Sequence, residues 1–110
     1  MYRALLHVDS GDRVNRGLRS LQHLLDDLNG EVAVVLVANG DAVSALRRTA
    51  PQAAPLRGLL EQGVTVVGCG HSLVRAGIAP DELVDGVNVV PSGLGELVRR
   101  EGEGFAYVKL

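Results

Sequence analysis

Five short runs rich in valine, leucine and other strand-forming residues divide the chain at regular intervals. They are Tyr2–Val8, Val32–Ala38, Val64–Gly68, Val87–Val90 and Phe105–Leu110. The second and third runs are almost continuous in valine and leucine, which is typical of strands covered on both faces in a parallel sheet. The sequence therefore predicts five short strands in a mostly parallel sheet.

The segments between these runs carry helical patterns. The clearest is an apolar stripe at helical spacing that ends at Asn29-Gly30 and consists of Val14, Leu18, Leu21, Leu25 and Leu28. Shorter helices are predicted from Asp41, as an N-cap, to Leu46, from Pro55 to Gly63, from just after Cys69 to Gly77, over Pro80–Val84, and after Ser92, with Leu94, Leu97 and Val98 as apolar positions. Alternating strands and helices predict a three-layer α/β/α fold, and 110 residues suffice for one domain, 1–110.

Composition excludes several classes of function. The net charge is −2, the basic residues are scattered, and only three residues are aromatic, so we expect no nucleic-acid partner. No apolar run reaches the roughly 18 residues that a membrane span needs, and the first residues lack the apolar core of a signal peptide. A single cysteine cannot form an internal disulfide, and a free thiol without an export signal predicts a cytoplasmic protein.

In parallel α/β folds, ligands and reactive groups gather at the carboxyl ends of the strands. The polar residues at these ends include Asp9, Asn39, Cys69 and Ser92. Any active site should therefore be assembled from these segments.

Cys69 is the residue most suited to chemistry. It lies at a predicted strand-to-helix turn between Gly68 and Gly70, where backbone N–H groups can stabilise a thiolate and a substrate can approach closely. His71 could add a proton or a positive charge, and Ser72 a hydroxyl near the helix start. The alternative is that Cys69 is a small buried apolar residue, the commonest role of a free cysteine.

Cys69 and Arg75 also match the Cys-x5-Arg spacing of cysteine-dependent phosphatases, in which an arginine and backbone N–H groups bind an oxyanion. The match is incomplete, because Ser72 stands where such loops normally have glycine and Ala76 where they have serine or threonine. The plain alternative is a solvent-facing arginine on the helix after Cys69.

The remaining features indicate no cofactor. His7 and His23 are far apart in sequence, and no His, Cys or Asp cluster has metal-ligand spacing. Asp9 and Asp12 could bind a cation or cap the first helix. The segment from Ser92 to Gly95 could cradle an anion, although capping of the last helix explains it better.

Three segments together resemble the DsrE/DsrF-like family: VAVVLVANG at 32–40, GVTVVGCGHS at 63–72 and VNVVPSGLGELVRREGEGFAYVKL at 87–110. The resemblance covers nearly the whole chain and implies a five-stranded parallel sheet between helices. It further implies a homo-oligomer, trimer or hexamer, and a sulfur-relay role in which Cys69 carries sulfur as a persulfide between thiol-bearing donor and acceptor proteins.

Three hypotheses remain open from the sequence. The first is a sulfur carrier or sulfurtransferase that uses Cys69, supported by Gly70, His71 and Ser72. The second is a non-enzymatic oligomeric protein that binds a small ligand or a partner segment in a crevice lined by Asp9, Asn39, Cys69 and Ser92. The third is a phosphatase that uses Cys69 and Arg75.

Overall fold

All five predicted strands form one parallel sheet in the computed structural model, which describes residues 1–110. The strands are β1 (Tyr2–Val8), β2 (Val32–Ala38), β3 (Thr65–Cys69), β4 (Asn88–Val90) and β5 (Ala106–Lys109), and their order in the sheet is β4-β3-β2-β1-β5. Each neighbouring pair is parallel. β1 and β2 match the sequence prediction residue for residue, β4 differs from it by one residue at its start, and β3 and β5 differ by one residue at each end.

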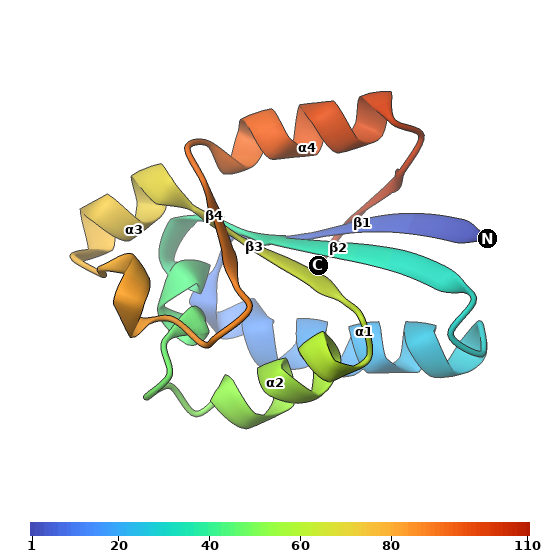
Figure 1. Ribbon diagram of the computed structural model, residues 1–110, viewed down its shortest axis with the longest axis horizontal. Coiled ribbons are helices and arrows are strands. Elements are labelled where there is room, and N and C mark those ends of the chain that lie inside the picture. Colours follow the sequence, from blue (N-terminus) through green and yellow to red (C-terminus); the bar gives the residue numbers. More distant parts are fainter.

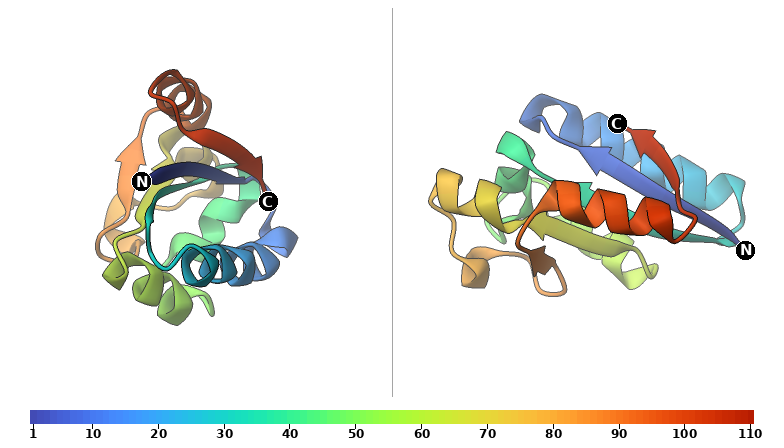
Figure 2. Two further views of the ribbon diagram at one scale, coloured as in Figure 1. Left: turned by 90° about the vertical axis from the view of Figure 1, so that its right-hand side faces the viewer. Right: turned by 90° about the horizontal axis from the view of Figure 1, so that it is seen from above.

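Helices cover both faces of this sheet, which confirms the predicted three-layer fold. The helices are α1 (Val14–Asp27), α2 (Ala53–Glu61), α3 (Gly70–Ala76) and α4 (Gly93–Gly102), with short 3-10 helices at Gly11–Arg13, Gly40–Leu46 and Pro80–Glu82. Figure 1 shows α1 and α2 on one face and α4 alone on the other, and both views of Figure 2 agree. The reason is topological: β1 to β4 are added in one direction, and the chain then returns over the opposite face to place β5 beside β1.

The two faces bury very different amounts of apolar surface. The face under α1 and α2 belongs to a cluster of 24 buried residues. The face under α4 has a cluster of only five, namely Leu5, Val35, Val37, Val67 and Leu97. The α4 layer is therefore the thin side of the molecule.

The predicted apolar stripe of α4 is wrong at two of its three positions. Leu97 is buried, as expected, but Leu94 is 63% and Val98 73% exposed. Gly93 and Glu96 are the residues that face the sheet together with Leu97. The helix turns this way because Gly93 packs closely on the sheet, with no side chain to hold it off, and Glu96 buries its carboxylate against two arginines.

Two expected helix caps are also corrected. Asp41 lies inside the 3-10 helix that follows β2, and its carboxylate accepts the Gly11 N–H at 2.6 Å instead of capping its own helix. Asp12 lies inside the preceding 3-10 helix and accepts the Ser10 hydroxyl, while α1 begins without a side-chain cap. Both carboxylates therefore organise the loops after β1 and β2.

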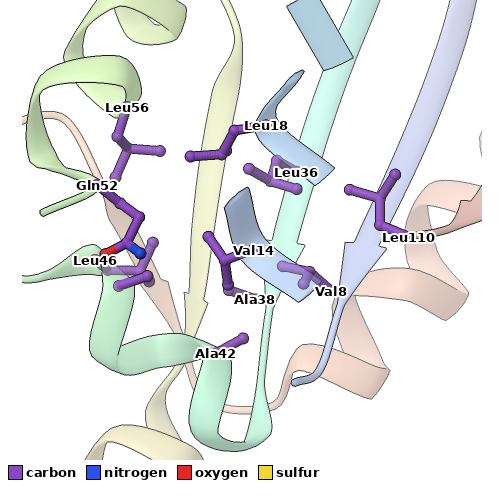
Figure 3. Close-up of a pocket in the computed structure, with 11 residues that line it drawn as sticks. Val8, Val14, Leu18, Leu36, Ala38, Ala42, Leu46, Gln52, Leu56 and Leu110 are labelled. Atoms are coloured by element: carbon purple, nitrogen blue, oxygen red, sulfur yellow. The ribbon is translucent and has the colours of Figure 1, made fainter. Parts of the chain in front are cut away.

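The best-enclosed gap in the larger core is too small to bind a ligand. It measures about 10 Å³, about the volume that one water molecule needs, and its lining is apolar apart from Gln52. Figure 3 shows Leu110 of the C-terminus beside this gap with Val14 and Leu18 of α1. No helix is both long and apolar enough to cross a membrane.

Candidate functional site

Cys69 is the last residue of β3 and the N-cap of α3, as the sequence predicted. It lies at the edge where the carboxyl ends of the parallel strands meet, on the face that α4 covers. The residue is 6% exposed, so the thiol lies just beneath the surface. A reagent must therefore be small, or neighbouring groups must move, for the sulfur to react.

The surroundings of Cys69 favour the thiolate. Burial raises the pKa of the thiol, but hydrogen bonding from the Ser72 hydroxyl and from the backbone N–H groups of Gly93, Ser72 and His71 outweighs burial and lowers the pKa below its ordinary value. The predicted contribution of His71 is therefore made by its backbone, and the side chain of this residue is exposed. A thiol in such a setting is a better nucleophile at neutral pH and a better leaving group than an ordinary cysteine.

The Ser72 hydroxyl is oriented by the loop after β2. Its oxygen accepts the Gly40 N–H at 2.9 Å, which leaves the hydroxyl proton free to be donated to the Cys69 sulfur. Gly40 has φ +58°, and a Cβ there would lie 2.5 Å from the carbonyl oxygen of Asp9. Only glycine fits this position without displacing the backbone, so Gly40 is a site residue that sequence reasoning missed.

Two further glycines bring the chain close to the thiol. A Cβ on Gly93 would lie 3.2 Å from the Cβ of Cys69 and 3.4 Å from the Cβ of Asn39. A Cβ on Gly70 would lie 2.9 Å from the carbonyl oxygen of Val90 at the end of β4. Gly70 thus admits the backbone of the neighbouring strand, but its own N–H group is not among those that reach the sulfur, which belong to Gly93, Ser72 and His71.

A hydrogen-bonded chain of three side chains lies next to this site. His7 on β1 is 6% exposed, and its Nδ1 lies 2.7 Å from the Tyr107 hydroxyl on β5. Its Nε2 lies 2.8 Å from Oδ1 of Asn39, which follows β2. The sequence analysis singled out Asn39 but not its partners. His7 follows Leu5 by two positions on β1, so its side chain points to the same face, the one that α4 covers.

Asp9 and Arg75 lie in a separate cleft. This open cleft of about 400 Å³ is lined by Asp9, Ser10, Gly40, Asp41, Ser72, Arg75 and Ala76. Asp9 also forms an ion pair with Lys109 at 3.0 Å, and the hydrogen bond from Lys109, despite the opposing effect of burial, lowers the pKa of its carboxyl. Ser72 is the one residue shared by the cleft and the groups that act on Cys69, so the predicted crevice of Asp9, Asn39, Cys69 and Ser92 is divided in two.

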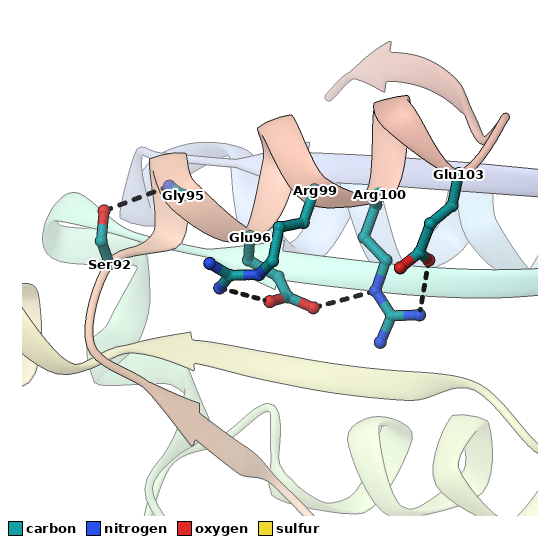
Figure 4. Close-up of polar contacts among 6 residues, drawn as sticks. All are labelled: Ser92, Gly95, Glu96, Arg99, Arg100 and Glu103. Carbon is teal, nitrogen blue, oxygen red and sulfur yellow. Dashed lines mark hydrogen bonds and ion pairs between the residues drawn. The ribbon is translucent and has the colours of Figure 1, made fainter.

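Ser92 caps α4, as the capping interpretation predicted. Its hydroxyl oxygen accepts the Gly95 N–H at 3.1 Å, and one turn later Glu96 pairs with Arg99 at 2.9 Å and Arg100 at 2.8 Å (Figure 4). The Ser92 cap holds the first turn of α4, which carries the Gly93 N–H to the thiol. Ser92 therefore supports the site through the backbone and is not among the residues that hydrogen-bond to the sulfur.

No three His, Cys, Asp or Glu side chains lie together in a way that could hold a metal ion. The groups gathered at the strand ends are hydrogen-bond donors around one thiol. Such an arrangement suits covalent chemistry at sulfur more than binding of a metal.

Solved structures confirm the fold. A protein of unknown function from Methanobacterium thermoautotrophicum, MTH1491, shares 35% identity over 100% of both chains with a TM-score of 0.93. The ychN protein from E. coli shares 22% identity over 100% of both chains with a TM-score of 0.88. BT1422 of Bacteroides thetaiotaomicron, a conserved protein of unknown function, shares 15% identity over 98% of this chain and 94% of its own, with a TM-score of 0.76.

The resemblance read from the sequence is also confirmed at the level of the family. No functionally curated protein matches the sequence. The DsrE/DsrF-like family model, however, matches residues 7–110, which include every strand end described above. The chain belongs to the DsrE/DsrF-like family.

Proposed function

We propose that this protein is a sulfur carrier of the cytoplasm that holds a sulfane sulfur as a persulfide on Cys69. The observation that supports the proposal most strongly is the lowered pKa of this single cysteine, produced by Ser72 and by backbone N–H groups at the strand ends. Membership of the DsrE/DsrF-like family is consistent with this role.

Loading needs no oxidant or cofactor. The Cys69 thiolate attacks the outer sulfur of a donor persulfide, R–S–SH, and a new S–S bond forms as the bond within the donor breaks. The donor's inner sulfur leaves with the electron pair as a thiolate, R–S⁻, and Cys69 becomes Cys69–S–SH.

Unloading is the same step in reverse direction. An acceptor thiolate attacks the outer sulfur, and Cys69 leaves as a thiolate. The Ser72 hydroxyl and the Gly93 N–H, which stabilise the resting thiolate, then stabilise the leaving group. The same contacts therefore assist both directions of transfer.

The test is sulfur loading measured by mass spectrometry of the intact protein. Incubation with a small-molecule persulfide donor should add the mass of one sulfur atom, and peptide mapping should place it on Cys69. Cys69→Ser is the matched control and should gain no mass. A wild-type protein that stays unloaded while the donor remains active would contradict the proposal.

We also propose that copies of this chain assemble into a homo-oligomer, a trimer or hexamer, through the outer side of α4. Leu94 and Val98 are one turn apart on this side and are largely exposed. The five-residue core beneath α4 is small, so a second copy would add apolar burial where the monomer has least. Because Gly93 begins α4 and covers Cys69, such an interface would lie close to the thiol.

A ligand-binding role has one specific observation in its favour. The cleft of about 400 Å³ presents Arg75, which has no ion-pair partner, beside Ser72. Cys69 does not line this cleft, so Arg75 and the thiol do not face one common anion site, as the phosphatase hypothesis would require. Binding of a small ligand that survives in Cys69→Ser would favour the ligand-binding role. Hydrolysis of an aryl phosphate that needs both Cys69 and Arg75 would favour the phosphatase.

A further inference from the structure

The chain of Tyr107, His7 and Asn39 has no part in stabilising the resting thiolate. The groups that lower the pKa of Cys69 belong to Ser72, Gly93 and His71, and none of the three residues of the chain is among them. Yet these three side chains connect distant segments: the buried imidazole of His7 on β1 is hydrogen-bonded both to Tyr107 on β5 and to Asn39 at the end of β2. A buried imidazole on the thin apolar face is costly unless both of its nitrogens are hydrogen-bonded, and Tyr107 and Asn39 supply these two partners.

In the structure the amide oxygen of Asn39 faces His7, and this arrangement sets the donor and acceptor roles along the three side chains. An amide oxygen can only accept a hydrogen bond, so Nε2 of His7 must carry the proton that lies between it and Oδ1 of Asn39. In the neutral imidazole Nδ1 is then an acceptor, and the Tyr107 hydroxyl donates to it.

This orientation leaves the two N–H groups of Asn39 without a partner in the protein. The Asn39 side chain makes a single hydrogen bond, the one from His7 through its oxygen. Asn39 lies beside the thiol, because a Cβ placed on Gly93 would be 3.4 Å from the Cβ of Asn39 and 3.2 Å from the Cβ of Cys69. The amide thus offers unused donors next to the thiol without acting on the sulfur itself.

We infer that Asn39 binds the outer sulfur of the persulfide on Cys69, and that His7 and Tyr107 are positioning residues that hold its amide in the donating orientation. This inference rests on the proposed function. An outer sulfur would extend about 2 Å beyond the cysteine sulfur, and the Cβ atoms of Cys69 and Asn39 are close enough for the amide to reach it. A persulfide ionises to an anion at its outer sulfur, and an N–H group that donates to this anion stabilises the loaded protein over the empty one. The substrate class is accordingly an anionic sulfane sulfur.

The test measures how much of the protein is loaded at equilibrium with a fixed ratio of a small persulfide to its parent thiol. Asn39→Asp keeps the shape and still accepts from His7 but has no N–H to donate, and Asn39→Ala removes the side chain. Asn39→Ala should lower the ratio of loaded to empty protein by about tenfold, the effect of losing one hydrogen bond to a charged group. Asn39→Asp should lower it further, because its carboxylate also repels the anion. Tyr107→Phe removes one of the two hydrogen bonds that hold the His7 ring and so loosens the support of the amide, and it should lower the ratio by a smaller factor.

Tyr2→Phe and Asn88→Ala are matched controls, because both residues are exposed on strands and take no part in the chain. They should load like the wild type. The pH midpoint of Cys69 alkylation should stay unchanged in Asn39→Ala and Tyr107→Phe, which separates binding of the outer sulfur from a general disturbance of the site.

The two proposals fail in different ways. If the wild type does not load at all, the sulfur-carrier function is wrong. If the wild type loads, and the Asn39 and Tyr107 variants load to the same extent and have the circular dichroism spectra of folded proteins, the carrier function stands. The proposed role of Tyr107, His7 and Asn39 is then overturned. A shift of the alkylation midpoint that accounts for the whole loss of loading would also overturn this role, because the three side chains would then act on the thiol of Cys69 itself.

Discussion

At the scale of the residue, Ser72 connects the Cys69 thiol by hydrogen bonds to the loop after β2. Its oxygen accepts the Gly40 N–H, and its proton is directed to Cys69. Ser72→Ala should therefore raise the pKa of Cys69, since the thiolate loses a hydrogen bond to a charged group, which contributes about 1.5 kcal/mol or more. The measurement is the pH dependence of alkylation of the native protein. Ser20→Ala, at an exposed position of α1, should leave the midpoint unchanged, and an unchanged midpoint in Ser72→Ala would refute this role.

Gly40 sets the position of that serine through its backbone. Because its φ is +58° and a side chain would meet the Asp9 carbonyl, Gly40→Ala should lower the free energy of unfolding by about 2 kcal/mol or more and also raise the pKa of Cys69. Gly30→Ala is the matched control: its φ is +73°, but the space around it is open, so it should cost about 1 kcal/mol and leave the pKa alone. Urea denaturation and alkylation together check both parts. Equal costs at the two glycines would show that the Asp9 contact is unimportant.

At the scale of elements, α4 is held by a buried carboxylate. Hydrogen bonds from Arg99, and then from Arg100, outweigh burial and lower the pKa of Glu96 below its usual value of 4.5. The folded protein therefore binds this proton less readily than the unfolded chain. The stabilisation from Glu96 is fully present above pH 4.5 and is lost as the pH falls through the lowered pKa.

Glu96→Ala should accordingly lower the free energy of unfolding at pH 7 by about 1–2 kcal/mol, between the values for exposed helix pairs and for buried hydrogen bonds to charged groups. The difference from the wild type should shrink as the pH is lowered below 4.5. Glu101→Ala on the same helix removes a carboxylate that has no ion pair and should have little effect. Urea denaturation at both pH values is the measurement, and a difference that does not depend on pH would contradict this account of Glu96.

Much of the element layout could be predicted because it depends on local patterns. The valine runs of β1 and β2, the Ser92 cap and the turn at Cys69 are all encoded by neighbouring residues. What the sequence could not indicate depends on contacts between distant segments. Examples are the rotation of α4 that exposes Leu94 and the hydrogen bond from the Gly40 N–H to Ser72. Another is the hydrogen bond between His7 and Tyr107, which are 100 positions apart.

At the scale of the whole molecule, the unequal faces of the sheet predict where copies meet. Val98→Glu, and likewise Leu94→Glu, should place a charge in the proposed contact over α4 and convert the oligomer to smaller species. Ser20→Glu lies on α1, on the opposite layer, and should leave the assembly intact. Light scattering coupled to size exclusion gives the mass of each species. A wild-type protein that is monomeric at high concentration, or an oligomer that tolerates both α4 variants, would contradict the proposed interface.

The most direct measurement of the central claim is a complete transfer cycle on the wild-type protein. The protein is loaded with a persulfide donor, freed of excess donor, and then mixed with a small thiol acceptor while the intact mass is followed. We predict that Cys69 gains one sulfur atom and then returns to its original mass as the acceptor becomes a persulfide, and that Ser72→Ala slows both steps. A thiol that never gains sulfur, or one that gains it and cannot release it to an acceptor thiol, would contradict the account.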